Sequence, residues 1–361
     1  MPRVVSFTGP RAAEVVDEPA RPLTEQDVRL RTLFSGISAG TELTAYRGTN
    51  PYLSKRWDND RRLFVDGTAS REYPLLGWGY EEVGEVVEIG GGVDTVSVGD
   101  RIWGTWGHRS GTVVTAEYAR DRVLAPEVDP RVGMFSQIGG IALNVVLDAD
   151  IHVGETVAVF GLGVPGQLVA QLARLNGGRV IAVDGVASRR ELALKLGAAE
   201  ALDPADGEIA EQIRARTDGR GADVCLEVTG NYAALHEAIR SVAYSSRVCA
   251  AGFMQGDGVG LRLARSSTTT GSRSSRPRSP GWRPRCSTAG IVSDWTARRS
   301  PRRLGRPAGN RSHQSHVSAG TRGRGVRTAR RGVAGCPPGR APGESLNLAG
   351  RLAGIPDRER T

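Results

Sequence analysis

Residues 154–184 read GETVAVFGLGVPGQLVAQLARLNGGRVIAVD, which is a strand, a glycine loop, a helix and a second strand in that order. The apolar run at 155–161 predicts a buried strand. The helix that follows is amphipathic, because it places three leucines on one face: Leu168, Leu172 and Leu175. A second strand is predicted at 179–184. Two strands joined by a helix in this way form a βαβ unit, which predicts an α/β fold with a parallel sheet.

The loop between the first strand and the helix carries three glycines with the spacing Gly-x-Gly-x-x-Gly. The first glycine permits a tight turn, the second lets the backbone approach a pyrophosphate, and the third lets helix and strand pack closely. The pyrophosphate would lie on the helix N-terminus, where free N–H groups and the dipole favour negative charge. We therefore expect a nicotinamide dinucleotide on six residues: Gly161, Leu162, Gly163, Val164, Pro165 and Gly166.

Asp184 ends the second predicted strand. A carboxylate there can accept bonds from the ribose hydroxyls and would repel a 2′-phosphate, which favours NAD over NADP. Arg189 and Arg190 follow closely and leave NADP as an alternative cofactor. The alternative role for Asp184 is a helix-entry cap. We also assign Thr229 and Gly252 to the cofactor site.

The chain divides into three segments by pattern. Residues 1–150 predict a β-rich, partly open barrel, because short β-type runs are separated by Gly and Pro. Residues 151–263 predict a doubly wound parallel sheet of the Rossmann type, because strands alternate with helices. The first segment has predicted strands at 3–7, 13–16, 28–34, 83–89, 101–103 and 112–118, and the second at 155–161, 179–184, 201–203, 222–228 and 247–253.

The third segment, residues 264–361, is rich in Arg, Ser, Gly and Pro and has no hydrophobic period, which predicts a disordered tail. Residues 1–263 carry 27 basic and 35 acidic side chains, whereas the tail carries 21 arginines, no lysine and four acidic residues. The net charge of +9 therefore comes from the tail. Arginine without lysine is typical of a GC-rich gene translated out of frame, and we predict a frameshift near Ala264. The alternative is a nucleic-acid-binding segment that contacts phosphates.

The four cysteines form no Cys-x-x-Cys pair, and none has a histidine at metal spacing. No apolar run approaches the roughly 20 residues that a membrane helix needs. No stretch near the N-terminus has the pattern of a signal peptide. We therefore expect a cytoplasmic protein without a membrane partner.

Three stretches resemble the medium-chain dehydrogenase/reductase superfamily. Residues 154–184 are similar to the family's cofactor segment, and GYEEVGEVVEIG at 79–90 to the segment whose zinc form reads Gly-His-Glu. SGISAGTE at 35–42 is similar to its first zinc-ligand loop and resembles bacteriochlorophyllide dehydrogenase-like members. The resemblance implies a GroES-like catalytic domain before a Rossmann domain. It also implies an NAD(P)-dependent oxidoreductase with a small-molecule substrate and a homo-oligomeric state.

The departures from the family concern zinc. Ser38 stands where the zinc enzymes have a ligand cysteine, and Tyr80 stands where they have a ligand histidine. Zinc needs thiolate, imidazole or carboxylate donors in a tetrahedron, and a serine hydroxyl and a neutral phenol are poor substitutes. Residues 100–120 contain no cysteine, so the family's structural zinc lobe is absent. Only Glu42 and Glu81 remain as donors, and we expect no zinc.

Without zinc, a positioned donor must stabilise the alkoxide that develops during hydride transfer. The resemblance brings Tyr80, Ser38 and Thr41 to the position of the missing metal. We predict Tyr80 as the proton donor, with Glu81 and Glu42 as its modulators. The alternatives are that Tyr80 only fills the vacated pocket and that Glu81 is a structural ion-pair partner. His108 lies on a predicted loop, where it either lines the substrate cleft or is a surface residue.

These features predict an oxidoreductase that transfers a hydride between NAD(H) and an alcohol/carbonyl pair without zinc. The alternative within enzymes is a quinone or enone reductase of the same superfamily. The alternative outside enzymes is an inactive cofactor-binding remnant, because a frameshift would remove the last strand and the return to the catalytic domain. We expect no specific nucleic-acid partner.

Overall fold

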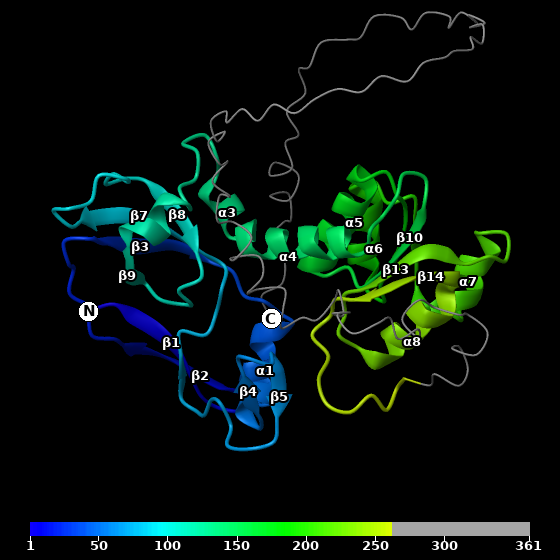
Figure 1. Cartoon of the computed structure of the whole chain (residues 1–361), viewed down its shortest axis with the longest axis horizontal. Coiled ribbons are helices and arrows are strands. Elements are labelled where there is room, and N and C mark those ends of the chain that lie inside the picture. The colour runs from blue at the N-terminus through cyan, green and yellow to red at the C-terminus, as the bar shows by residue number, and fades with distance from the viewer. Residues whose placement is uncertain (262–361) are drawn as a thin grey trace, which may run out of the picture. The chain divides into compact units, whose positions relative to one another are not determined.

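The computed structural model describes residues 1–261 (Figure 1). The predictions for residues 264–361, which are the disordered tail, the frameshift and the nucleic-acid segment, lie outside the described residues. In the part of the chain that is described, no helix combines the length and the apolar character needed to cross a membrane.

A five-stranded parallel sheet forms the second half of the described chain, in the order β12-β11-β10-β13-β14. The strands are β10 (Thr156–Phe160), β11 (Arg179–Val183), β12 (Glu200–Leu202), β13 (Ala222–Glu227) and β14 (Val242–Ala250). The helices between them are α5 (Val164–Leu175), α6 (Ala187–Lys195), α7 (Ile209–Ala215) and α8 (Tyr232–Ser241), with a short 3₁₀ turn η2 (Pro204–Asp206). The predicted α/β fold with a parallel sheet is confirmed.

Both faces of this sheet are covered, because alternate residues of β10 enter two different hydrophobic cores. Val157 and Val159 pack into the core that contains α4 (Phe135–Asp148) and α5. Ala158 and Phe160 pack into the core that contains α7 and α8. Every residue of β10 is buried, which explains why its sequence is continuously apolar.

The first half of the described chain contains a four-stranded antiparallel sheet in the order β8-β7-β3-β9, a three-stranded sheet β2-β1-β6, and a ribbon β4-β5. These strands are β1 (Arg3–Gly9), β2 (Ala12–Asp17), β3 (Asp27–Ser35), β4 (Arg56–Asp58), β5 (Leu63–Val65), β6 (Leu75–Leu76), β7 (Glu82–Ile89), β8 (Arg101–Gly104) and β9 (Gly111–Thr115). The core of the four-stranded sheet includes Val28, Leu30, Val86, Ile102 and Trp106. The predicted β-rich character of this half is confirmed.

Several helices in this half are absent from the sequence prediction: α1 (Thr41–Arg47), η1 (Pro51–Leu53), α2 (Ala116–Arg120), α3 (Pro130–Gly133) and α4. The predicted strand at 112–118 is wrong at its end. Strand β9 stops at Thr115, whose hydroxyl accepts a bond from the Tyr118 N–H and caps α2. Helix α4 was missed because its buried residues include the polar Gln137 and the small Gly140, which blur the apolar period.

Two further predictions in the second half are wrong in detail. Leu175 is 50% exposed, so the buried face of α5 runs through smaller side chains such as Ala170 and Ala173 instead. Strand β14 covers 242–250 instead of 247–253, since the chain becomes extended at Val242, directly after α8. Its register against β13 shifts between Ala222 and Val224, which places an irregularity early in the strand.

Candidate active site

The glycine loop has the geometry that its spacing predicts. Gly161 has a φ of +93°, in the left-handed region that favours glycine. A Cβ at Gly166 would lie 1.8 Å from the Gly161 carbonyl oxygen, so no larger residue fits there. A Cβ at Gly163 would meet only the Pro165 Cδ atom, at 3.9 Å. The space beside Gly163 is therefore open, as the approach of a ligand to the backbone requires.

Helix α5 begins directly after Gly163, and no side chain caps its N-terminus. Its first turn carries no acidic residue. In the described residues, the positive end of this helix dipole therefore has neither a side-chain cap nor an acidic residue in its first turn. A dinucleotide pyrophosphate fits this combination of an open loop and an uncapped helix.

Asp184 connects the end of β11 to the glycine loop. Its carboxylate accepts hydrogen bonds from the backbone N–H of Leu162, at 2.7 Å, and from that of Val186, at 2.8 Å. The second bond holds the residue that precedes α6, but no side chain caps that helix, so the alternative role of Asp184 as a helix-entry cap is wrong. The Asp184 side chain is 8% exposed, and the half-exposed Arg189 guanidinium lies 3.6 Å from it. Arg190 is instead engaged with the Asp184 carbonyl and with Asp203.

Glu227, which the sequence reasoning missed, organises the loop after β13. It is fully buried, and its carboxylate accepts bonds from the Thr229 N–H at 2.6 Å, the Thr229 hydroxyl and the Gly230 N–H at 3.1 Å. Burial raises the pKa of Glu227, against the opposing effect of these bonds. A Cβ at Gly161 would lie 2.5 Å from the Thr229 methyl, and one at Gly252 would lie 2.1 Å from the Gly230 nitrogen. Thr229 therefore borders the glycine loop, and Gly252 borders the neighbouring turn.

Gln167 is a second residue that the sequence reasoning missed. Its side chain is buried, and its Nε2 atom donates to the carbonyl oxygens of Leu162, at 3.2 Å, and Arg189, at 2.8 Å. It therefore ties the glycine loop to α6. The sequence signal was a polar side chain directly after the third glycine, at the start of a helix whose next residues are apolar and buried.

A separate cluster lies in the β-rich half, and it unites the four predicted catalytic residues. Tyr80 donates a 2.6 Å hydrogen bond to the Ser38 hydroxyl. Burial raises the pKa of Tyr80 to about 12, the side-chain bonds to Ser38 and Thr41 lower it, and the charges of Glu81 and Glu42 raise it further. The phenol is therefore neutral at physiological pH, with both the hydroxyl partners and the carboxylates close by.

Three carboxylates in this cluster are almost inaccessible to solvent: Glu42, Glu81 and Glu82. Burial, followed by the charges of Glu42 and Glu82, raises the pKa of Glu81 to about 7. Burial is also the main reason that the pKa of Glu82 rises to about 7. Proton gain and loss by these two groups therefore falls within the physiological range.

His108 lies among these carboxylates, and the surface alternative for it is wrong. Its side chain is 9% exposed, its Nε2 atom is 2.9 Å from Glu42 Oε2, and its Nδ1 atom is 2.5 Å from the Ser35 hydroxyl. Burial alone would lower the pKa of His108, but the bond to Glu42 and the charges of Glu42, Glu82 and Glu81 raise it. An imidazolium paired with Glu42 is the form that this environment favours.

Two glycines make room for these side chains. A Cβ at Gly36 would lie 2.7 Å from Glu81 Oε2, and one at Gly79 would lie 2.9 Å from His108 Nε2. Ser35 and Glu82 are the residues of this cluster that the sequence reasoning missed. Glu82 is the first residue of β7, and the available sequence signal was a carboxylate beside the apolar residues of that predicted strand.

The donor set of this cluster does not fit a zinc ion. Tyr80 and Ser38 bond to each other, and one Glu42 oxygen is bound to His108. Within residues 1–261, no group of three or more His, Cys, Asp or Glu side chains is placed so that it could hold a metal. Glu42 Oε1 and Glu82 Oε2 are buried without a hydrogen-bond partner among those residues.

Comparison with known proteins agrees with this architecture. Residues 165–277 match the sequence family described as zinc-binding dehydrogenase. The chain is 29% identical over 265 residues to D-guloside 3-dehydrogenase of Escherichia coli K12, a match that covers 72% of this chain and 75% of that protein. It is 30% identical over 210 residues to L-threonine 3-dehydrogenase of Caldanaerobacter subterraneus, which covers 50% and 60% of the two chains.

Solved structures share the fold. The 2R,3R-butanediol dehydrogenase of Bacillus subtilis superposes with a TM-score of 0.59 and 23% identity, over 71% of this chain and 79% of that chain. A dehydrogenase of Sinorhizobium meliloti 1021, solved with NADP bound, gives a TM-score of 0.58 and 23% identity, over 70% and 77% of the two chains.

The parallel sheet, the glycine loop and the dehydrogenase relatives define an oxidoreductase of the alcohol-dehydrogenase type. More narrowly, residues 165–277 match the zinc-binding dehydrogenase family, and the relatives that share 29–30% identity with the chain are dehydrogenases of the medium-chain dehydrogenase/reductase type.

Proposed function

We propose that this protein transfers a hydride between NAD(H) and the alcohol/carbonyl pair of a small organic molecule, without zinc. The observation that carries the proposal is the partly buried Tyr80–Ser38 hydrogen bond, which joins the two residues that the sequence resemblance aligns with metal ligands of the zinc enzymes. The relatives that act on a sugar, on threonine or on butanediol support an alcohol as the substrate.

A nicotinamide dinucleotide, when bound, supplies or accepts the hydride. The glycine loop and the uncapped start of α5 would hold its pyrophosphate. Asp184 would accept bonds from the adenosine ribose, since a carboxylate has lone pairs beyond the two that the backbone uses. Its negative charge opposes a 2′-phosphate, while the exposed Arg189 would partly offset that repulsion. On this balance NAD is preferred to NADP.

In the reducing direction, a hydride reaches the carbonyl carbon and the carbonyl π electrons move to the oxygen. Tyr80 would then give its phenol proton to that oxygen, which yields the alcohol. Its raised pKa keeps the phenol protonated at neutral pH, so the donor is present in nearly every molecule. Ser38 would orient the phenol and stabilise the phenolate by returning a hydrogen bond. Glu81, Glu42 and Thr41 adjust the pKa of Tyr80.

The test uses the full chain. NADH and NADPH binding are measured by fluorescence, and a panel of alcohols, ketones and enones is then assayed before and after removal of metal by a strong chelator. We expect tighter binding of NADH, turnover of an alcohol/carbonyl pair, and unchanged turnover after chelation. Activity that is lost on chelation and restored by Zn²⁺ would overturn the zinc-free mechanism.

Two other outcomes identify the alternatives. Turnover confined to enones or quinones would favour the quinone-reductase alternative. Cofactor binding, with thermal stabilisation but without turnover of any compound, would identify an inactive cofactor-binding remnant.

A further inference from the structure

Ser35 and His108, which have no part in the proposed hydride transfer, form a hydrogen-bonded series with Glu42. The Ser35 hydroxyl is 2.5 Å from His108 Nδ1, and His108 Nε2 is 2.9 Å from Glu42 Oε2. Strand β3 ends at Ser35, Glu42 lies in the first turn of α1, and His108 lies between β8 and β9. A hydroxyl beside an imidazole that a carboxylate holds from the other side is the arrangement of a nucleophile, its general base and the acid that orients the base.

Solvent access falls along this series in the order that nucleophilic chemistry requires. Ser35 is exposed, whereas the side chain of His108 is 9% exposed and that of Glu42 is 1% exposed. The hydroxyl can therefore meet a reagent from solution. The bond between the imidazole and the carboxylate is shielded from water, which strengthens it and fixes the ring.

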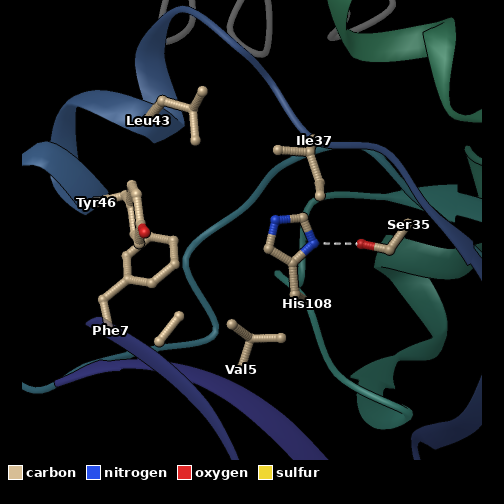
Figure 2. Close-up of a pocket in the computed structure, with 8 residues that line it drawn as sticks. Val5, Phe7, Ser35, Ile37, Leu43, Tyr46 and His108 are labelled. Atoms are coloured by element: carbon tan, nitrogen blue, oxygen red, sulfur yellow. Dashed lines mark hydrogen bonds between the residues drawn. The ribbon is translucent and has the colours of Figure 1, made fainter. Parts of the chain in front are cut away.

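A cavity of about 420 Å³ adjoins the hydroxyl (Figure 2). Its volume falls within the roughly 300–1,000 Å³ that small-molecule sites enclose. Ser35 and His108 line it together with apolar side chains that include Phe7 and Leu43. Figure 2 shows the imidazole joined to the Ser35 hydroxyl, with Ile37 next to the ring. An apolar acyl group suits this lining better than a polar one, since buried polar atoms without partners oppose binding.

We propose that Ser35 is the nucleophile of a second activity, the hydrolysis of esters with a short apolar acyl group, and that His108 is its general base. This activity goes beyond the proposed hydride transfer. It uses a different acceptor of the proton and needs no dinucleotide.

The reaction needs only the ester and water. The Ser35 oxygen forms a bond to the acyl carbon while its proton passes to His108 Nδ1. The bond between the acyl carbon and the alkoxy oxygen then breaks, and the alcohol leaves with that proton. Water attacks the acyl carbon in the same way, which releases the carboxylic acid and restores the Ser35 hydroxyl. Glu42 stabilises the imidazolium that forms in each half of the reaction.

The backbone next to the nucleophile predicts a slow reaction. The Gly36 N–H donates to the Glu81 carbonyl oxygen at 2.7 Å, so it is not free to stabilise an oxyanion. Removal of one oxyanion donor costs roughly 100- to 1,000-fold in rate. We therefore expect hydrolysis of activated esters, whose leaving groups need little assistance, and covalent labelling of Ser35.

The neutral imidazole is the form that accepts the proton. Burial lowers the pKa of His108, whereas the bond to Glu42 and the charges of the nearby carboxylates raise it above its ordinary value. Those charges belong to Glu42, Glu82 and Glu81. The neutral form therefore gains population toward alkaline pH, and about pH 9 is the condition for the test.

The experiment treats the full chain, without dinucleotide, with an alkyl fluorophosphonate, and peptide mass spectrometry locates the adduct. We expect an adduct on Ser35 that is absent from Ser35→Ala. Labelling should be at least about tenfold slower in His108→Gln, because a general base contributes roughly 100-fold or more. Ser97→Ala is the matched control, since Ser97 is also exposed but does not line the cavity.

Glu42→Gln is the second variant, and its readout is one that a merely structural role would not move. Loss of the carboxylate charge lowers the pKa of His108, so the pH at which labelling is half-maximal should fall. The maximal labelling rate should fall as well, since the imidazolium loses its charged partner. A labelling profile with the wild-type midpoint would overturn the link from Glu42 to His108.

Esters of different length test the cavity. Each buried methylene favours binding about fourfold, so kcat/KM for p-nitrophenyl hexanoate should exceed that for the acetate by at least about tenfold. Leu43→Trp places an indole in the apolar wall and should remove most of this preference. Ile37→Trp is the milder variant, because Ile37 is 69% exposed. Val98→Trp is the control, since Val98 is 61% exposed and does not line the cavity.

An unlabelled Ser35 in the wild type would overturn the second activity. Equal labelling rates in the wild type and in folded His108→Gln would overturn the assignment of the base. Equal kcat/KM for the two esters, or an unchanged preference in both filled variants, would overturn the cavity as the acyl site.

Discussion

The backbone N–H of Leu162 donates a 2.7 Å hydrogen bond to the carboxylate of Asp184, which joins the glycine loop to the end of β11. The residue proposed to choose between NAD and NADP therefore also holds the loop proposed to bind the pyrophosphate. A substitution at Asp184 should change both the stability of the apoprotein and the cofactor preference.

Asp184→Asn tests this double role. One carboxylate oxygen becomes an NH₂ group, which faces a backbone N–H instead of accepting from it. We expect a loss of about 1–3 kcal/mol in the free energy of unfolding. The ratio of NADH affinity to NADPH affinity should fall by about tenfold. This change corresponds to the free energy of one hydrogen bond to a charged group. Chemical denaturation and cofactor titration measure the two effects.

Asp203→Asn is the control, because Asp203 accepts from the Ala205 N–H and pairs with Arg190 but makes no bond to the glycine loop. It should lower stability without altering the preference between NADH and NADPH. An equal change of preference in both variants would contradict a specific role for Asp184.

Two glycine substitutions separate packing from ligand approach. Gly166→Ala should strongly destabilise the apoprotein, because its Cβ would overlap the Gly161 carbonyl oxygen. Gly163→Ala should change apoprotein stability by less than about 1 kcal/mol, the loss of backbone freedom in the unfolded chain being the main effect. Its Cβ occupies open space in the apoprotein, yet it should weaken NADH by roughly tenfold, because the methyl would lie where the pyrophosphate approaches.

Thermal unfolding and NADH titration of the two glycine variants check this contrast. Wild-type NADH affinity in Gly163→Ala would show that the cofactor does not approach the backbone at this residue.

Tyr80→Phe removes the proposed proton donor and keeps the aromatic ring. We expect kcat to fall by about 100-fold or more, the usual contribution of a positioned general acid. NADH affinity should be unchanged, since Tyr80 lies outside the glycine loop. Steady-state kinetics in both directions measure the effect.

Tyr244→Phe is the matched control, because that phenol is 74% exposed. Its activity should equal that of the wild type. If Tyr80→Phe also retains full kcat, Tyr80 only fills space and another group supplies the proton.

The buried acids predict how stability depends on pH. The folded-state pKa of Glu82 is raised from 4.5 to about 7, so its protonated form is the one that the fold accommodates. The stability associated with it is fully present below about pH 4.5 and is lost as the pH rises through 7. Glu81 and His108 act in the same direction, because their pKa values are also raised. The free energy of unfolding should therefore fall between pH 5 and pH 8.

Glu82→Gln should flatten this profile and stabilise the protein at pH 8 by on the order of 3 kcal/mol, the free energy that corresponds to the shift. Denaturation at several pH values checks it. Glu85→Gln, at a more exposed position that pairs with Arg31, should keep the wild-type profile. A Glu82→Gln profile as steep as the wild type would contradict the assignment.

The α/β fold and the cofactor loop could be predicted from the sequence because their signals are local. The signals for the cofactor loop lie within a dozen residues: the apolar run of β10, the three glycines and the start of α5. At each of them the residue types by themselves predict the conformation of the backbone. The β-rich strands were also predictable from short apolar runs. Helix α4 was not, because Gln137 and Gly140 on its buried face interrupt the apolar period, and only its packing with α5 shows that face to be part of the core.

The sequence resemblance predicted that Tyr80, Ser38 and Thr41 lie close together. The surroundings of His108 could be recognised only in the tertiary structure. In sequence it is a lone loop histidine, and its partners Ser35 and Glu42 lie 73 and 66 positions away. Glu227 and Gln167 were missed for a similar reason, since a buried polar side chain is recognised by the groups that satisfy it and not by its neighbours in the chain.

The sequence by itself thus determined the class of fold and the position of the dinucleotide loop, since the conformational freedom of glycine and the period of apolar residues act over a few residues. Tertiary structure alone decided that His108 faces three carboxylates and that an apolar cavity opens beside it. Electrostatics and burial depend on distance in space, and residues far apart in the chain set both for this cluster.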